Sequence, residues 1–219
     1  MKLEWSVIWE HRQLFFDGVL VTIGLTITTM LIAVPAGMAL AMMRLSQHRI
    51  FSSFSFAFVE FFRNVPLILV VYWAFYVMPI FLNIEFSAFA TGLVALSLNV
   101  SAYNAETFRS GIHSIRKGQT MAGLALGMSQ FQIFKSIILP QATRRILPIL
   151  ASTWVSLFKD TSLVSVISVG DLAHNALMIR SQTFRVLEVL TAMAGIYWLL
   201  GYPQAKLAEW VKRKFEVKE

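Results

Sequence analysis

Long runs without a charged residue, separated by short polar and charged stretches, dominate this sequence. Four of these runs contain 26, 21, 20 and 17 residues and occupy residues 18–43, 64–84, 86–105 and 189–205. A helix needs about 20 apolar residues to cross the hydrocarbon core of a bilayer, and an ionised side chain at its centre is costly. Each run therefore predicts a membrane-spanning helix.

A fifth apolar stretch, residues 146–170, differs from the other four because it carries Lys159 and Asp160 close to its midpoint. Ionisable groups at membrane depth are costly unless they are paired or face a wet cavity, and by default they mark a pathway. We therefore count this stretch as a fifth span and treat its charged pair as the main candidate for substrate chemistry.

The composition agrees with a protein in lipid. Hydrophobic residues make up 57% and charged residues only 14% of the 219 positions, whereas about 25% charged residues is typical of soluble domains. The chain has no Cys, which excludes a disulfide scaffold or a thiolate metal site. The net charge of +7 is attributed to basic cytoplasmic loops, and no nucleic acid is expected as a partner.

The distribution of basic residues predicts the orientation in the membrane. With five spans, fourteen of the 19 Lys and Arg residues fall on one face if Arg63 lies there, and thirteen without it. Such an excess marks the cytoplasmic side. The N-terminus is then outside and the C-terminus in the cytoplasm. The other face keeps Lys2, Arg12, Lys159, Arg180 and Arg185.

Together these features predict an all-α membrane protein with five transmembrane helices in a single domain, residues 1–219. The expected spans are residues 18–43, 58–82, 86–108, 146–170 and 187–206. The one long insertion, residues 110–140, is expected to lie in the cytoplasm.

That insertion has the pattern of a helical hairpin. Helix formers after Gly118 lead to Gly127, and a second helical segment runs from Phe131 to Leu139. We expect a helix, a glycine turn, a second helix and a stop at Pro140. Apolar residues of the second helix recur at helical spacing, so this helix is expected to lie on the bundle with the turn presented outward; these residues are Ile133, Phe134, Ile137 and Ile138. The alternative is a surface hairpin without a partner.

The hairpin also carries a resemblance to a known family. Met121-Ala122-Gly123, Gly127, and then Ile137, Leu139 and Pro140 are similar to the E-A-A-x3-G-x9-I-x-L-P loop of permease subunits of binding-protein-dependent ABC importers. The sequence differs from the family at Met121, where Glu is frequent, and at Gly123, where Ala is frequent.

Three further segments resemble the branch of that family that transports polar amino acids. They are Glu60 to Leu67, similar to F-R-G-T-P-L; Tyr103, Glu106 and Arg109, similar to Y-x-x-E-x-x-R; and Lys159 to Leu163, similar to K-D-T/S-S-L. The four matches occur in the order found in the family.

The resemblance implies a type I ABC importer permease fold with a cytoplasmic coupling-helix loop, in a bacterial inner membrane. The implied partners are a second permease subunit, identical or homologous, two cytoplasmic ATPases, an extracytoplasmic binding protein and a polar amino acid. No cofactor is expected in this chain, because ATP and Mg²⁺ would be held by the ATPases and no G-x4-G-K-[ST] motif is present. The residues implied to contact an ATPase are Met121, Ala122, Gly123, Gly127, Met128, Ser129 and Pro140.

The candidate substrate residues form a polar stripe on the fourth span. Thr153, Ser156 and Asp160 follow one another at i, i+3 and i+7 and share one helix face, so an ammonium group can meet Asp160 while hydroxyls orient the rest. The expected substrate-binding residues are Asp160, Thr153, Ser156, Lys159, Thr161, Ser162 and Arg63. Two alternatives remain open: the charged pair can lie at a helix break near the outer interface, and Arg63 can extend to the membrane surface instead of meeting a carboxylate.

On the third span, Asn99, Tyr103 and Glu106 share one helix face. Hydrogen bonds between helices are the preferred explanation of this face, and Glu106 and Arg109 are expected to form a local ion pair.

Two other functions compete with an importer permease. A membrane scaffold without a transport path predicts that Lys159 and Asp160 are sealed in contacts, and a secondary transporter is disfavoured by the lack of an inverted repeat. The sequence does not distinguish which amino acid is carried.

Overall fold

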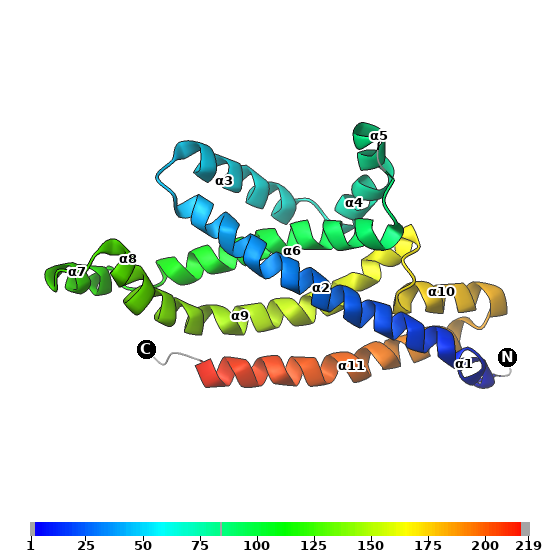
Figure 1. Ribbon diagram of the computed structural model, residues 1–219. Coiled ribbons are helices and arrows are strands. Elements are labelled where there is room, and N and C mark those ends of the chain that lie inside the picture. Colours follow the sequence, from blue (N-terminus) through cyan, green and yellow to red (C-terminus); the bar gives the residue numbers. More distant parts are fainter. Residues whose placement is uncertain (1–2, 84, 216–219) are drawn as a thin grey trace.

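The structure is a computed structural model that describes residues 3–83 and 85–215, and every regular element in these two ranges is a helix. The prediction of an all-α protein is confirmed for them; Lys2, Lys218 and residue 84, used in the sequence argument, lie outside them. The long helices are α2 (Arg12–Leu45), α3 (Arg49–Asn64), α6 (Ala88–His113), α9 (Leu139–Asp160) and α11 (Val186–Phe215). In Figure 1 they extend along a common direction, with α2 across α6 and α9 beside α11.

Small residues let these helices approach closely. A Cβ atom added at Gly37 of α2 would lie 2.6 Å from the Cβ of Asn104 on α6, and one added at Gly111 of α6 would lie 2.3 Å from a side-chain carbon of Ile146 on α9. Lipid provides little hydrophobic drive for helices to associate, so close packing through small residues is a common way to hold them together.

The segment predicted as one span over residues 58–82 is divided at a proline. Helix α3 ends at Asn64, Val65 is extended (φ −89°, ψ 129°), and the chain resumes after Pro66 as an arm bent by 108° from α3. The residue before a proline is disfavoured in helical conformation, which explains the break. The arm consists of α4 (Leu67–Tyr72), the π-helical turn η1 (Trp73–Val77) and α5 (Met78–Leu82). Its first part, α4 and η1, packs against α6, and α5 projects away from the long helices (Figure 1).

The expected stop at Pro140 is wrong. The hairpin consists of α7 (Lys117–Ala125), α8 (Gln130–Ile133) and the π-helical turn η2 (Phe134–Ile138), and α9 follows without interruption, with Pro140 in its first turn. A proline has no N–H and clashes with the carbonyl four residues earlier. A π-helical turn shifts the hydrogen-bond pattern by one residue and so lets the helical path pass through the proline. The same arrangement occurs where η1 precedes Pro79.

The helix, glycine turn and helix of the hairpin are confirmed, but the second helix does not pack as expected. Ile133 is fully buried against Gly123 of α7, where an added Cβ would lie 2.7 Å from its side chain, and Ile137 contacts the same glycine. The apolar face of the second helix therefore closes the hairpin on itself, and the hairpin projects from one end of the bundle (Figure 1).

The opposite end holds the remaining elements. After α9 the chain continues as the 3₁₀ helix η3 (Thr161–Ile167) and turns at Ser168, whose φ is 62°, into α10 (Leu172–Thr183). Asp171 caps α10 by accepting hydrogen bonds from the backbone N–H groups of Ala173 and His174. The short α1 (Ser6–Glu10) packs beside the start of α11.

The helices of the structure can be compared with the predicted number of membrane crossings. Within the described residues, α2 and α11 are long and apolar enough to cross a membrane, and up to four crossings result if each bent pair of helices is one span. Helix α6 is not among them, because its polar and charged positions lower its hydropathy. These polar positions are mostly buried against neighbouring helices, and five crossings stay a prediction.

Candidate functional site

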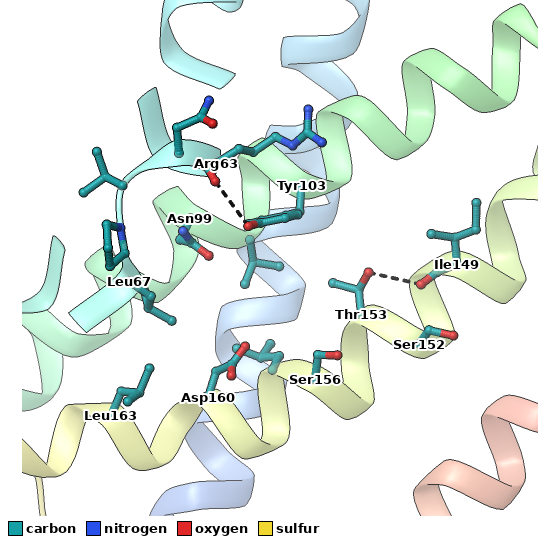
Figure 2. A pocket seen from close by; sticks show the side chains of 15 residues that line it. Arg63, Leu67, Asn99, Tyr103, Ile149, Ser152, Thr153, Ser156, Asp160 and Leu163 are labelled. Atoms are coloured by element: carbon teal, nitrogen blue, oxygen red, sulfur yellow. Dashed lines mark hydrogen bonds between the residues drawn. The ribbon is translucent and has the colours of Figure 1, made fainter. Parts of the chain in front are cut away.

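A cavity of about 540 Å³ lies where the end of α3, the middle of α6 and the second half of α9 come together. Figure 2 shows α9 along one wall and the end of α3 with α6 along the other. The polar residues that line it are Arg63, Asn64, Asn99, Tyr103, Ser152, Thr153, Ser156 and Asp160.

The α9 wall contains the stripe predicted from helical spacing. Thr153, Ser156 and Asp160 all line the cavity (Figure 2). The Thr153 hydroxyl donates to the carbonyl of Ile149 at 3.1 Å within its own helix and keeps its oxygen lone pairs for another partner. In the described residues the carboxylate of Asp160 accepts no hydrogen bond and forms no ion pair. A half-buried carboxylate is therefore available to a ligand.

The opposite wall is organised by hydrogen bonds from α6 to the end of α3. The Asn99 side chain donates to the carbonyl of Phe62 at 2.8 Å, and the Tyr103 hydroxyl donates to the carbonyl of Arg63 at 3.4 Å. The last carbonyls of a helix have no partner within the helix, so α6 supplies donors where α3 stops at Val65. The predicted hydrogen bonding between helices is confirmed for Asn99 and Tyr103, which also line the cavity.

Arg63 lies on the same wall as Tyr103. Its guanidinium is 5.7 Å from the centre of the Tyr103 ring, and in the described part of the chain it forms no ion pair. Arg63 and Asp160, which are separated by almost 100 positions in the sequence, thus face one cavity from opposite sides (Figure 2).

Three of the predicted substrate residues are not brought to the cavity. Lys159 is exposed on another side of α9 and does not pair with Asp160, because adjacent residues of a helix do not face each other. Thr161 is fully buried and donates to the carbonyl of Phe158 at 2.8 Å, and Ser162 donates to the carbonyl of Lys159 at 2.8 Å. Their hydroxyls serve the transition from α9 to η3.

Two polar lining residues were not predicted as substrate residues. Ser152 lies one turn before Ser156, so the helical spacing that identified the stripe could have included it. Asn64 follows Arg63 at the end of α3, and its amide donates to the side chain of Glu60 at 3.2 Å. Asn64 is the last residue of α3, directly before the break at Val65 and Pro66, and it lines the cavity together with them.

The expected pair next to the cavity is confirmed. Arg109 donates to both carboxylate oxygens of Glu106, at 2.9 and 2.5 Å. Because neither residue lines the cavity, this pair neutralises two charges locally and leaves Arg63 and Asp160 as the charged groups that face it.

The tip of the hairpin is shaped by Gly127. Its φ of 74° lies in the left-handed region, and the N–H groups of Gly127 and Met128 donate to the carbonyls of Leu124 and Gly123 at 2.9 and 3.0 Å. This is the pattern of a Schellman motif, which closes a helix at a glycine. Ser129 then begins α8 with a capping box shared with Gln132.

The residues expected to contact an ATPase are grouped on this hairpin, with the exception of Pro140. Met121 is 67% exposed and Ala122 is exposed beside it, whereas Gly123 is buried against Ile133. Met128 is half-buried in the turn and Ser129 is exposed. Pro140 lies in the first turn of α9, away from the hairpin tip.

Comparison with known proteins decides the family. Residues 33–217 match the family described as "binding-protein-dependent transport system inner membrane component". The chain belongs to this family. The matched range includes both the cavity and the hairpin.

Several permease proteins are similar to this inner membrane component over nearly the whole length of both chains. The chain is 34% identical to the glutamate/aspartate import permease protein GltK of Escherichia coli, over 97% of this chain and 98% of that protein. It is 30% identical to the glutamine transport system permease protein GlnP of Escherichia coli, over 99% and 100%, and 30% identical to the arginine transport system permease protein ArtQ of Bacillus subtilis, over 99% of each chain.

Chains in solved structures of ABC transporters have the same fold as this protein. One chain from a crystal structure of an amino acid ABC transporter with histidines superposes with a TM-score of 0.91 at 30% identity, covering 98% of this chain and all of that one. A chain of the methionine ABC transporter MetNI, in an inward-facing conformation, gives a TM-score of 0.70 at 18% identity and supports the fold alone. The predicted permease fold is confirmed at this level.

Proposed function

We propose that this inner membrane component is the permease subunit of an ABC transporter that imports a polar amino acid, with the cavity between α3, α6 and α9 as part of the path. The amino acids named for the relatives, glutamate, aspartate, glutamine and arginine, all carry an α-ammonium and an α-carboxylate group. A path for this class therefore needs one group that attracts each.

The observation that carries the proposal is the placement of two unpaired, opposite charges across one cavity. Asp160 lies on α9 and Arg63 at the end of α3, and each lines the cavity without an ion-pair partner among the described residues. A scaffold subunit predicts that the charge on Asp160 is sealed in contacts. A carboxylate left open to a cavity at membrane depth favours a pathway instead.

The geometry suggests how a zwitterion is held. Asp160 lies where α9 passes into η3, and its open carboxylate attracts a cation such as the α-ammonium group. Arg63 offers the planar donor pair that suits a carboxylate. The hydroxyls of Thr153 and Ser156 lie beside Asp160 along α9 (Figure 2) and can orient the bound molecule.

The proposed transport step needs partner chains. A second permease subunit, identical or homologous, would complete the path, an extracytoplasmic binding protein would deliver the amino acid, and two cytoplasmic ATPases would hold ATP and Mg²⁺. The contact to the ATPases is assigned to the hairpin, through Met121, Ala122, Gly123, Gly127, Met128 and Ser129, with Pro140 anchoring its second arm. ATP-driven movement of the hairpin would rock the long helices and change the side that the cavity faces.

The orientation proposed from the basic residues, with the N-terminus outside and the C-terminus in the cytoplasm, is supported by the arrangement of the helices. The start of α1 and the end of α11 lie at opposite ends of the bundle, and the hairpin shares its end with the end of α11 (Figure 1). An odd number of crossings, such as the five proposed, places the two termini on opposite sides of the membrane.

The test replaces the carboxylate of Asp160 without changing its size. In proteoliposomes that contain the complete transporter, Asp160→Asn is expected to reduce amino acid uptake by roughly tenfold or more, because a charged hydrogen bond to the ammonium is lost. Asp17→Asn is the matched control, since Asp17 is an exposed carboxylate of α2 outside the cavity. Full uptake by Asp160→Asn in an intact complex would remove Asp160 from the path.

A further inference from the structure

We infer that the cavity selects an amino acid with an uncharged polar side chain, of the kind that glutamine has, and discriminates against acidic and basic side chains. This inference rests on the proposed function and adds the chemical class of the side chain. It is carried by the balance of charges and the hydrogen-bonding groups around the cavity.

The charges that line the cavity balance each other. Among the 15 lining residues, all within the described part of the chain, Arg63 and Asp160 are the two with ionised side chains. Any α-amino acid uses one positive and one negative partner for its α-carboxylate and α-ammonium groups. A charged side chain would bring a third charge into the cavity without a partner, and removing an unpaired charge from water is costly.

The charged residues nearby do not supply that partner. Glu106 is bonded to Arg109 through both carboxylate oxygens, and Lys159 is exposed and does not line the cavity. Glu60 accepts a hydrogen bond from the Asn64 amide and does not itself line the cavity.

The remaining polar groups match an uncharged side chain that both donates and accepts hydrogen bonds. Asn99 donates through its amide nitrogen to Phe62, which leaves its amide oxygen as an acceptor. Ser152 and Ser156 offer hydroxyl groups along α9 (Figure 2). Apolar residues fill the rest of the lining, among them Val65, Leu67, Ile149, Leu157 and Leu163.

The experiment measures binding to the transporter purified with its ATPase subunits and without the binding protein, so that the selectivity of the binding protein does not enter. Radiolabelled glutamine, glutamate and arginine are the probes. Glutamine is expected to bind at least about tenfold more tightly than glutamate or arginine. Glutamate is the sharpest comparison because it differs from glutamine only by a carboxylate in place of the amide.

Variants at one lining position test the charge balance directly. Ser152→Lys supplies a partner for an acidic side chain and is expected to move the preference toward glutamate by about tenfold, whereas Ser152→Asp moves it toward arginine. Thr143→Lys and Thr143→Asp are the matched controls, because Thr143 is an exposed hydroxyl residue of α9 outside the lining; they are expected to leave the preference unchanged.

The outcomes separate this inference from the proposed function. Wild-type protein that binds glutamate or arginine as tightly as glutamine overturns the selectivity and leaves amino acid transport standing. Uptake without measurable binding by the purified complex also overturns it. If the complete transporter neither binds nor takes up any of the three amino acids, the proposed function fails with it.

Discussion

Two carbonyl groups at the end of α3 accept hydrogen bonds from side chains of α6 that line the cavity. The two bonds differ in strength. Asn99 is 7% exposed and donates at 2.8 Å, whereas Tyr103 is 45% exposed and donates at 3.4 Å. Removing the partner of a buried carbonyl leaves it unsatisfied, but water can replace a lost bond at an exposed one.

We therefore expect Asn99→Leu to lower the free energy of unfolding by about 1 kcal/mol. Tyr103→Phe should change it by less than about 0.5 kcal/mol. Unfolding of the purified protein in detergent, followed by helical circular dichroism, checks both values. Equal losses in the two variants would contradict the assignment of Asn99 as the main bond between α6 and the end of α3.

At the residue scale, the α9 half of the site was predictable and the α3 half was not. Thr153, Ser156 and Asp160 lie within two helical turns, so the periodicity of a single helix groups them. Arg63 could be named as a candidate, but its position opposite Asp160 depends on how α3 ends and how α6 holds it. Lys159 was grouped with Asp160 by its place in the sequence, but neighbouring positions point to different sides of a helix, and Lys159 does not line the cavity.

At the scale of elements, prolines were the least predictable feature. Pro66 separates α3 from an arm bent by 108°, whereas Pro79 and Pro140 lie in helical paths that continue through them. The latter two each follow a π-helical turn, and the apolar pattern around the three prolines does not distinguish these cases. Glycine was a better guide, because the turn at Gly127 was predicted in the correct place.

Two glycines of the hairpin allow a clean test of that turn. A Cβ atom added at Gly127 or at Gly118 meets no atom within 4 Å, but only Gly127 has a positive φ, of 74°. Gly127→Ala is expected to destabilise the hairpin by about 1 kcal/mol because of backbone strain. Amide hydrogen exchange in α7 and α8 should then be roughly fivefold faster.

The control, Gly118→Ala, lies in the first turn of α7 and should leave exchange unchanged or slow it, since alanine favours helix more than glycine does. If both variants accelerate exchange equally, the left-handed turn is not what stabilises the hairpin tip.

At the scale of the whole molecule, hydropathy was sufficient to predict an all-helical membrane protein but not how its helices divide. A run of apolar residues has the same composition whether it forms one straight span, as in α2, or two segments bent at Pro66. Helix α6 shows the converse, because its buried polar residues reduce the hydropathy of a helix at the centre of the fold. Packing against other helices buries these residues, and Asn99 donates to the carbonyl of Phe62 on α3, which a single sequence window does not reveal.

Because the chain contains no Cys, single cysteines can report the membrane orientation of the whole molecule without background. Leu126, at the hairpin tip, is 80% exposed, and Glu10, at the end of α1, is exposed at the opposite end of the bundle. In intact cells that express the permease without its ATPases, an impermeant maleimide is expected to label Glu10→Cys. It should label Leu126→Cys only after the membrane is permeabilised, because thirteen of the 19 basic residues, not counting Arg63 in the cavity wall, are assigned to the cytoplasmic side. Labelling of Leu126→Cys from outside would place the hairpin where no cytoplasmic ATPase can reach it, and the proposed coupling would then be wrong.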